Sequence, residues 1–144
     1  RQQPPARRSP PQPIGLGRDA MTVRTVVADD VADIRLLVRL WLETCGDFEV
    51  VGEAENGHEV IDLAATEQPE LVILDLAMPE MDGLEALPQI LEASPATAVV
   101  ILSGYDRADF ADIVRAAGAI GYLNKRTAGP HLADEVLALL TARA

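Results

Sequence analysis

The feature that most constrains the fold is a regular alternation of short apolar segments and longer segments with helical periodicity, from residue 23 to the C-terminus. The short segments are rich in Val, Ile and Leu, and they are predicted to be β-strands at Val23–Ala28, Glu49–Ala54, Glu70–Asp75, Ala98–Ser103 and Ala119–Asn124. After each of them, apolar residues recur at helical spacing in residues 31–45, 57–68, 84–93, 106–118 and 130–144. The sequence therefore predicts five successive β-then-α units.

The composition of the strands indicates the type of sheet. The first, third and fourth strands are apolar at almost every position, as expected for strands covered by helices on both faces. Parallel strands joined by helices meet this requirement in an α/β fold. Five units in a chain of 144 residues predict a doubly wound, five-stranded parallel sheet with the flavodoxin-like strand order 2-1-3-4-5.

The helical periodicity also assigns side chains to the core. Val31 and Cys45 fall on the apolar face of the first helical segment, and Cys45 is interpreted as a core residue because free cysteines are commonly buried. Leu84 and Ile113 are expected to face inward from the third and fourth helical segments. Pro88 lies inside the third segment, where its missing backbone donor predicts a kink.

Charge divides the chain into two parts. Residues 1–20 are rich in Pro, Arg and Gln, carry a net +3 and are predicted to be a disordered tail, whereas residues 21–144 form the predicted domain. The whole chain carries −11, so the domain carries −14, which disfavours non-specific binding to nucleic acid or to an anionic membrane. One cysteine excludes an intrachain disulfide, and no apolar run spans a bilayer or forms a signal peptide. These properties suit a cytoplasmic protein.

Polar residues cluster where the predicted strands end. The first strand is followed by Asp29 and Asp30, the third ends on Asp75, the fourth ends on Ser103, and the fifth runs into Lys125. In a doubly wound sheet these carboxyl ends lie at one edge, where ligands bind. Three carboxylates placed together repel one another unless a cation is present, and Mg²⁺ prefers oxygen ligands. The pattern predicts a magnesium site at this edge.

Each of these residues has an ordinary structural interpretation when taken alone. An Asp pair can cap the following helix, a serine can form a turn, and a lysine can be a solvated surface charge. Together they are equipped for phosphoryl transfer, because Asp75 can act as nucleophile while Lys125 and the metal neutralise the transferring oxygens and Ser103 donates a hydrogen bond. The two histidines, His58 and His131, are interpreted as solvated surface residues.

Four stretches carry a family resemblance, namely "VVADD", "LVILDLAMPEMDGLEAL", "VVILSGYD" and "GYLNK". From about Val23 to Ala144 the chain resembles the CheY-like receiver domains of two-component response regulators, and in style it is nearest to receivers of LuxR-type helix-turn-helix regulators. The resemblance implies that Asp75 is the phosphoacceptor and that Asp29, Asp30, Asp75 and the Ala77 backbone carbonyl bind Mg²⁺. It also implies that Lys125 pairs with the phosphoryl group.

The same resemblance implies a switch and a set of partners. Ser103 would move toward the phosphoryl group and Tyr122 would turn inward, which would remodel the face made by the fourth helix, fifth strand and fifth helix. The phosphodonor would be a sensor histidine kinase, and phosphorylation would favour a homodimer. DNA would be reached only through an output domain absent from this chain. The domain would be a signalling switch that catalyses only its own phosphorylation and dephosphorylation.

Several alternatives remain open from the sequence. The chain is either a receiver excised from a transcription factor or a stand-alone receiver that signals by protein contact. A haloacid-dehalogenase-type phosphatase also uses an Asp nucleophile, but it needs a second Asp two residues later, where this chain has Ala77. A receiver-like binding module that has lost the switch usually lacks one of the site's acidic residues or its lysine, and this chain has all of them. One departure from the family pattern is Arg126, which follows the lysine where many receivers have a cis-proline.

Overall fold

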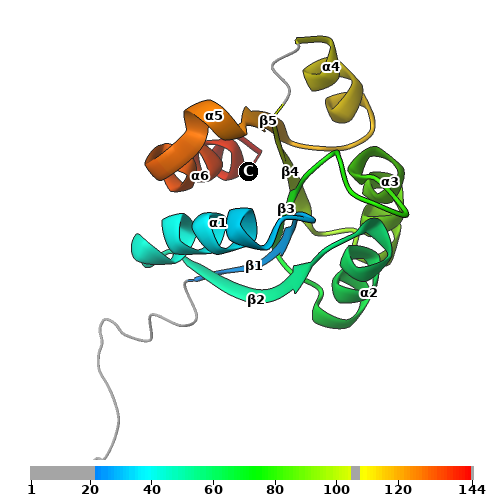
Figure 1. Ribbon diagram of the computed structural model, residues 1–144, viewed down its shortest axis with the longest axis horizontal. Coiled ribbons are helices and arrows are strands. Elements are labelled where there is room, and N and C mark those ends of the chain that lie inside the picture. Colours follow the sequence, from blue (N-terminus) through cyan, green and yellow to red (C-terminus); the bar gives the residue numbers. More distant parts are fainter. Residues whose placement is uncertain (1–21, 105–107, 144) are drawn as a thin grey trace, which may run out of the picture.

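The structure, a computed structural model, describes residues 22–104 and 108–143. The expected tail at residues 1–20 lies outside the described residues. The five strands are β1 (Val23–Ala28), β2 (Phe48–Ala54), β3 (Leu71–Leu74), β4 (Ala98–Ser103) and β5 (Gly121–Asn124). They form one parallel sheet in the order β2-β1-β3-β4-β5 (Figure 1), which confirms the predicted doubly wound topology.

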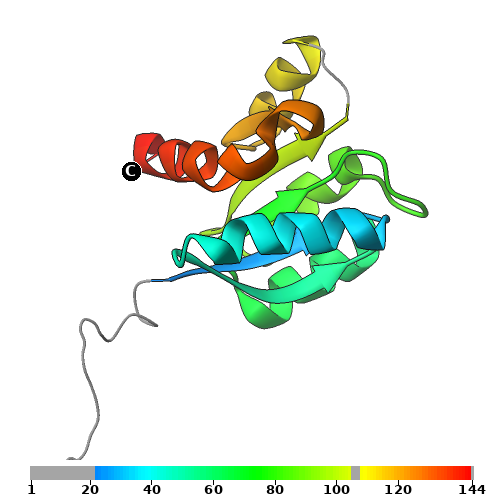
Figure 2. The same ribbon diagram turned by 60° about the vertical axis from the view of Figure 1, so that its left-hand side comes forward.

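The helices form two layers, one on each face of the sheet. They are α1 (Ala32–Thr44), α2 (Gly57–Glu67), α3 (Gly83–Ala93), α4 (Ala108–Ala116), α5 (Lys125–Ala128), the 3-10 turn η2 (Gly129–His131) and α6 (Leu132–Arg143). Helices α1, α5 and α6 lie on one side of the sheet, and α2, α3 and α4 lie on the other (Figures 1 and 2). None of the described helices is long and apolar enough to cross a membrane.

Alternation along the central strands builds two cores. In β3, Leu71 and Ile73 pack toward α1 and α6, whereas Val72 and Leu74 pack toward α2 and α3. All four side chains are at most 2% exposed. Burying an aliphatic side chain of this size stabilises a fold by about 1.5–3 kcal/mol. The strand that ends beside Asp75 is therefore buried along its whole length.

The burial of four apolar residues was predicted wrongly. Cys45 is exposed because α1 ends at Thr44, so the cysteine has left the helical face on which it was placed. Val31 is 47% exposed because it precedes the first helical residue as the N-cap. Ile113 and Leu84 are 45% and 39% exposed, since both line a cavity rather than the sheet. The prediction for His58 and His131 is confirmed, because both are exposed.

The last helical region starts earlier than predicted. Helix α5 begins at Lys125, because the Asn124 side chain accepts a 2.7 Å hydrogen bond from the backbone N–H of Arg126. Pro130, expected in the first turn of the final helix, lies instead in η2. No cis peptide bond occurs in the described part of the chain, so the bond after Lys125 is trans. Helix α3 continues through Pro88, and the kink expected there stays a prediction.

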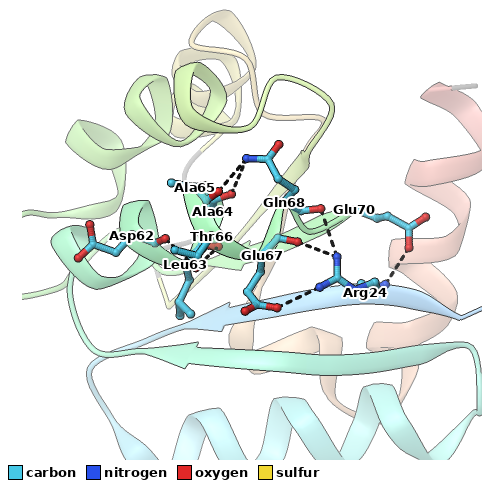
Figure 3. Close-up of polar contacts among 9 residues, drawn as sticks. All are labelled: Arg24, Asp62, Leu63, Ala64, Ala65, Thr66, Glu67, Gln68 and Glu70. Carbon is cyan, nitrogen blue, oxygen red and sulfur yellow. Dashed lines mark hydrogen bonds and ion pairs between the residues drawn. The ribbon is translucent and has the colours of Figure 1, made fainter.

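Arg24 fastens the start of β1 to the end of α2 (Figure 3). Its guanidinium donates to the carbonyl of Glu67 at 2.7 Å and pairs with the Glu67 carboxylate at 3.0 Å, while its backbone N–H donates to the Glu70 carboxylate at 2.9 Å. Gln68 ends α2 in a left-handed conformation at φ 46°. Its side-chain amide donates to the carbonyl of Ala93, which ties α2 to α3. The side chains of Arg24 and Gln68 thus hold the end of α2 at the end of the sheet opposite the aspartates.

We predict that Arg24→Ala lowers the free energy of unfolding by about 1–2 kcal/mol, because the backbone carbonyls of Glu67 and Gln68 lose the guanidinium as their donor. Urea denaturation followed by circular dichroism measures this change. Arg39→Ala is the matched control, since Arg39 forms two ion pairs, with the partly exposed side chains of Glu43 and Glu53, and neither of these contacts involves a backbone carbonyl. An Arg39→Ala cost equal to that of Arg24→Ala would contradict the prediction.

Candidate phosphoacceptor site

Backbone hydrogen bonds of the sheet hold two of the aspartates in place. Asp29 follows β1, and its N–H donates to the carbonyl of Ala54 at 3.0 Å. Asp75 follows β3, and its N–H donates to the carbonyl of Ala28 at 3.0 Å. The parallel ladder therefore extends one residue beyond each strand, which fixes both backbones before their side chains make any contact.

The three aspartates meet as the sequence predicted. Asp29, Asp30 and Asp75 each offer a carboxylate oxygen, and these oxygens lie within 4.8 Å of one another. Asp29 and Asp75 are buried, with 3% and 5% of their surface exposed, while Asp30 is exposed to solvent. Lys125 completes the group, since its Nζ lies 2.5 Å from Oδ2 of Asp29 and 3.2 Å from Oδ2 of Asp75. Residues that follow three different strands, β1, β3 and β5, thus form one compact site.

Burial and charge perturb both ends of this cluster. Burial raises the pKa of Asp75 above its usual value, the Lys125 ammonium acts against this, and the neighbouring Asp29 adds to the increase. Burial alone would lower the pKa of Lys125, but its hydrogen bond to Asp29 and its attraction to Asp75 and Asp29 outweigh this and raise it. The ammonium is therefore held in its charged form, while the Asp75 carboxylate is incompletely compensated.

The donor set fits a hard divalent cation. Three carboxylates and one ammonium leave two negative charges in excess, and two of the carboxylates are buried. Carboxylate oxygens are the ligands that Mg²⁺ prefers, and the exposed Asp30 leaves a side open to the water ligands that this ion usually keeps. The backbone N–H of Ala77 lies 3.4 Å from Oδ1 of Asp75, so the residue expected to supply a carbonyl lies beside the cluster.

The loop after β3 is packed closely against the backbone of Asp75. The N–H of Gly83, the first residue of α3, donates to the carbonyl of Leu76 at 2.9 Å. A Cβ atom at Gly83 would lie 2.1 Å from the Asp75 carbonyl oxygen, far inside contact distance. Within the same loop, Glu80 adopts a left-handed conformation at φ 69°, which is uncommon for a residue with a side chain. This loop leaves Asp75 little freedom to shift.

Ser103 and Tyr122 lie on the two neighbouring strands. Ser103 is the last residue of β4, is fully buried and is paired in register with Asn124, which directly precedes Lys125. Tyr122 is half-buried on β5 and packs against the core cluster that includes Leu74 and Ile101. Ser103 therefore lies on the strand next to β3 and Tyr122 lies one strand further out, in the order that the sequence predicted.

Two supporting residues were missed in the sequence. Arg35 donates to the backbone carbonyl of Asp29 at 2.6 Å and pairs with Glu53, so it ties the loop after β1 to β2. No local pattern points to this long-range contact. The Asp82 side chain caps α3 by accepting a hydrogen bond from the backbone N–H of Glu85, and the Glu85 side chain accepts one from the backbone N–H of Asp82. This capping box is visible in the sequence "DGLE".

Comparison with known proteins agrees with this site. The model of the response regulator receiver domain matches residues 25–137. The chain belongs to this receiver domain family. The matched residues include Asp29, Asp30, Asp75 and Lys125. The fold and strand order of the chain are those of CheY-like receivers. This receiver domain is homologous to transcriptional regulators of two-component systems.

Individual relatives include both curated proteins and a solved structure. It is 36% identical over 116 residues to the uncharacterized transcriptional regulatory protein YxjL of Bacillus subtilis, covering 81% of this chain and 53% of that protein. It is 36% identical over 118 residues to the response regulator protein VraR of Staphylococcus aureus, covering 81% and 56%. A two-component response regulator of the LuxR family from Aurantimonas sp. superposes with a TM-score of 0.78 at 30% identity, covering 84% and 86%. The chain spans about half the length of these two curated relatives.

We predict that Gly83→Ala lowers the free energy of unfolding by about 2 kcal/mol or more, because the new methyl group collides with the Asp75 carbonyl. Thermal and urea denaturation measure the change. Gly104→Ala is the control, since nothing lies within 4 Å of a Cβ there. Equal stability of the two variants would show that the β3–α3 loop yields to the extra atom.

Asp75→Asn is expected to raise the thermal midpoint of the metal-free domain at neutral pH. A carboxyl whose folded pKa is raised costs stability at every pH above that pKa, and asparagine removes this charge while Lys125 keeps Asp29 as partner. In differential scanning fluorimetry with EDTA, the variant should melt above the wild type. Added Mg²⁺ should then stabilise the wild type more than Asp75→Asn. A lower midpoint of the variant in EDTA would contradict this reasoning.

Proposed function

We propose that this receiver domain accepts a phosphoryl group on Asp75 from a sensor histidine kinase and that the modification switches its interaction surface. The observation that carries the proposal is the Lys125 ammonium, which contacts both Asp29 and Asp75 inside a cluster of three carboxylates. A structural ion pair needs only one carboxylate for each ammonium. Three carboxylates on fixed strand ends suit a site that binds a cation and reacts with a phosphoryl donor.

In the proposed reaction, one carboxylate oxygen of Asp75 attacks the phosphorus of a phosphohistidine. The new P–O bond forms as the P–N bond breaks, and the imidazole of the kinase leaves with the electron pair of the broken bond. Lys125 is positioned beside Asp75 to pair with the phosphoryl oxygens, at the cost of its present contact with the Asp75 carboxylate. With only 5% of its surface exposed, the Asp75 carboxylate itself meets little bulk water.

Magnesium is the proposed cofactor, held by Asp29, Asp30, Asp75 and the backbone carbonyl of Ala77. When bound, the ion would neutralise charge on the phosphoryl oxygens. Asp29 contributes from a fixed position, because its Oδ1 also accepts the N–H of Val31 at 2.9 Å. Asp30 is the exposed member and would hold the ion from the solvent side.

The proposed switch runs from the phosphoryl group to the face made by α4, β5 and the helices that follow β5. A phosphorylated aspartate carries more negative charge and new acceptor oxygens, which Ser103 and Lys125 would satisfy. Movement of Ser103 at the end of β4 would allow the half-buried Tyr122 on β5 to turn inward. Two conformations of one face, biased by one covalent change, would then control the partners that bind.

The proposed output is control of transcription through a DNA-binding domain separate from the receiver. The relatives support it, because YxjL is named a transcriptional regulatory protein and the chain covers only about half of its length. A homodimer formed on phosphorylation and a cytoplasmic location fit the same proposal. A stand-alone receiver that signals by protein contact is the alternative.

The test is phosphorylation of the purified chain by a small phosphodonor in Mg²⁺, followed by intact mass and size-exclusion chromatography. We expect a mass increase of one phosphoryl group on the wild type and none on Asp75→Asn or in EDTA. Lys125→Met should still fold but lose most of the phosphorylation, because the ammonium no longer pairs with the oxygens. Phosphorylation of Asp75→Asn at another residue would refute the assignment.

A further inference from the structure

A cavity of about 570 Å³ opens next to the aspartate cluster. Its floor is the β3–α3 loop from Leu76 to Pro79, and its far wall is the inner side of α4. Asp30 contributes from the loop after β1. The volume lies within the range of about 300–1,000 Å³ that is typical of small-molecule sites.

The lining of this cavity is mostly apolar. Phe110, Ile113 and Val114 of α4 face Met78 of the loop and Leu84 of α3 across it. Ile113 and Leu84 are 45% and 39% exposed, although their sequence pattern is that of core residues. Covering this exposed apolar surface with a ligand would remove it from water, which is favourable in proportion to the area buried.

The charged groups of the lining are all negative. Among the described residues that line the cavity, only Asp30 and Asp82 are charged. Asp82 already caps α3 through Glu85, so the exposed Asp30 is the carboxylate that is placed to meet a ligand. The Lys125 ammonium contacts Asp29 and Asp75 and is not among the residues that line the cavity. An anionic ligand would therefore be repelled and a cationic one attracted.

We propose that the cavity between α4 and the β3–α3 loop binds a small molecule that combines an apolar ring system with one positive charge. The ring system lies between Phe110, Ile113 and Met78, and the cationic group pairs with Asp30. This activity goes beyond phosphoryl transfer and makes the receiver responsive to a second chemical signal.

The position of Asp30 couples this site to the proposed metal site. Its carboxylate lines the cavity and also belongs to the three-aspartate cluster. A ligand ammonium and a divalent cation therefore compete for one carboxylate, so each lowers the apparent affinity of the other. Occupation of the cavity would oppose phosphorylation without any contact with Asp75.

The first experiment compares two probes that share one ring and differ in charge. The isotope-labelled chain in EDTA is titrated with tryptamine and, separately, with indole-3-acetate, while backbone amide shifts are followed by NMR. Tryptamine should shift Met78, Leu84 and Ile113 in a saturable manner, and indole-3-acetate should bind at least about tenfold more weakly. Equal binding of the two probes, shifts centred elsewhere, or no saturable shift with tryptamine would overturn the proposal.

Two variants with matched exposure locate the apolar contact. Ile113→Gln should weaken tryptamine binding about fivefold or more, because it removes an apolar wall of the cavity. Leu36→Gln is the control, since Leu36 is 55% exposed on α1, on the opposite side of the sheet. A similar loss in both variants would contradict the site.

The coupling has a separate test. Adding Mg²⁺ should raise the apparent Kd of tryptamine for the wild type, and Asp30→Asn should weaken tryptamine binding and abolish this Mg²⁺ effect. Unchanged tryptamine affinity in Asp30→Asn would overturn the role of that carboxylate. These measurements contain no phosphodonor, so binding of the probe and phosphorylation of Asp75 can each fail without the other.

Discussion

The site depends on the ion pairs of the Lys125 ammonium with two buried carboxylates, those of Asp29 and Asp75. Without it, Asp29 and Asp75 would face each other across a few ångströms with little water to screen them. The ammonium also joins distant parts of the chain, because it comes from the end of β5 while the aspartates follow β1 and β3. The strand order brings β1 and β3 side by side, and the lysine spans the remaining distance across β4.

The surrounding structure is organised to keep these few atoms still. Hydrogen bonds of the sheet continue to the N–H groups of Asp29 and Asp75, and Gly83 allows α3 to start against the carbonyl of Asp75. Arg35 holds the carbonyl of Asp29 from α1. These contacts use backbone atoms, so the side chains of the aspartates remain available for chemistry. A rigid backbone with reactive side chains is the arrangement that positioned catalysis requires.

The sequence predicted the sheet and the convergence of the site because both follow from repeated local patterns. β1 lies at Val23–Ala28 as expected, and residues that end parallel strands must meet at one edge. The errors occur where a local pattern is cut off by a terminus or a cavity. Cys45 continues the apolar spacing of α1, but the helix ends one residue before it. Ile113 has the spacing of a core residue, but its side chain lines a cavity. The early start of α5 depended on a side-chain cap from Asn124 that periodicity does not reveal.

Cations are distributed unevenly over the two helical layers. No lysine or arginine occurs between Arg39 and Arg107, so α2 and α3 carry carboxylates alone, whereas α1 carries Arg35 and Arg39 beside its acidic residues. The domain therefore has an electric dipole directed across the sheet. In solution the electric field of an approaching charged protein exerts a torque on this dipole, which turns the α2–α3 side toward a basic surface before any side chains touch. Orientation during encounter is in this way built into the composition of the layers.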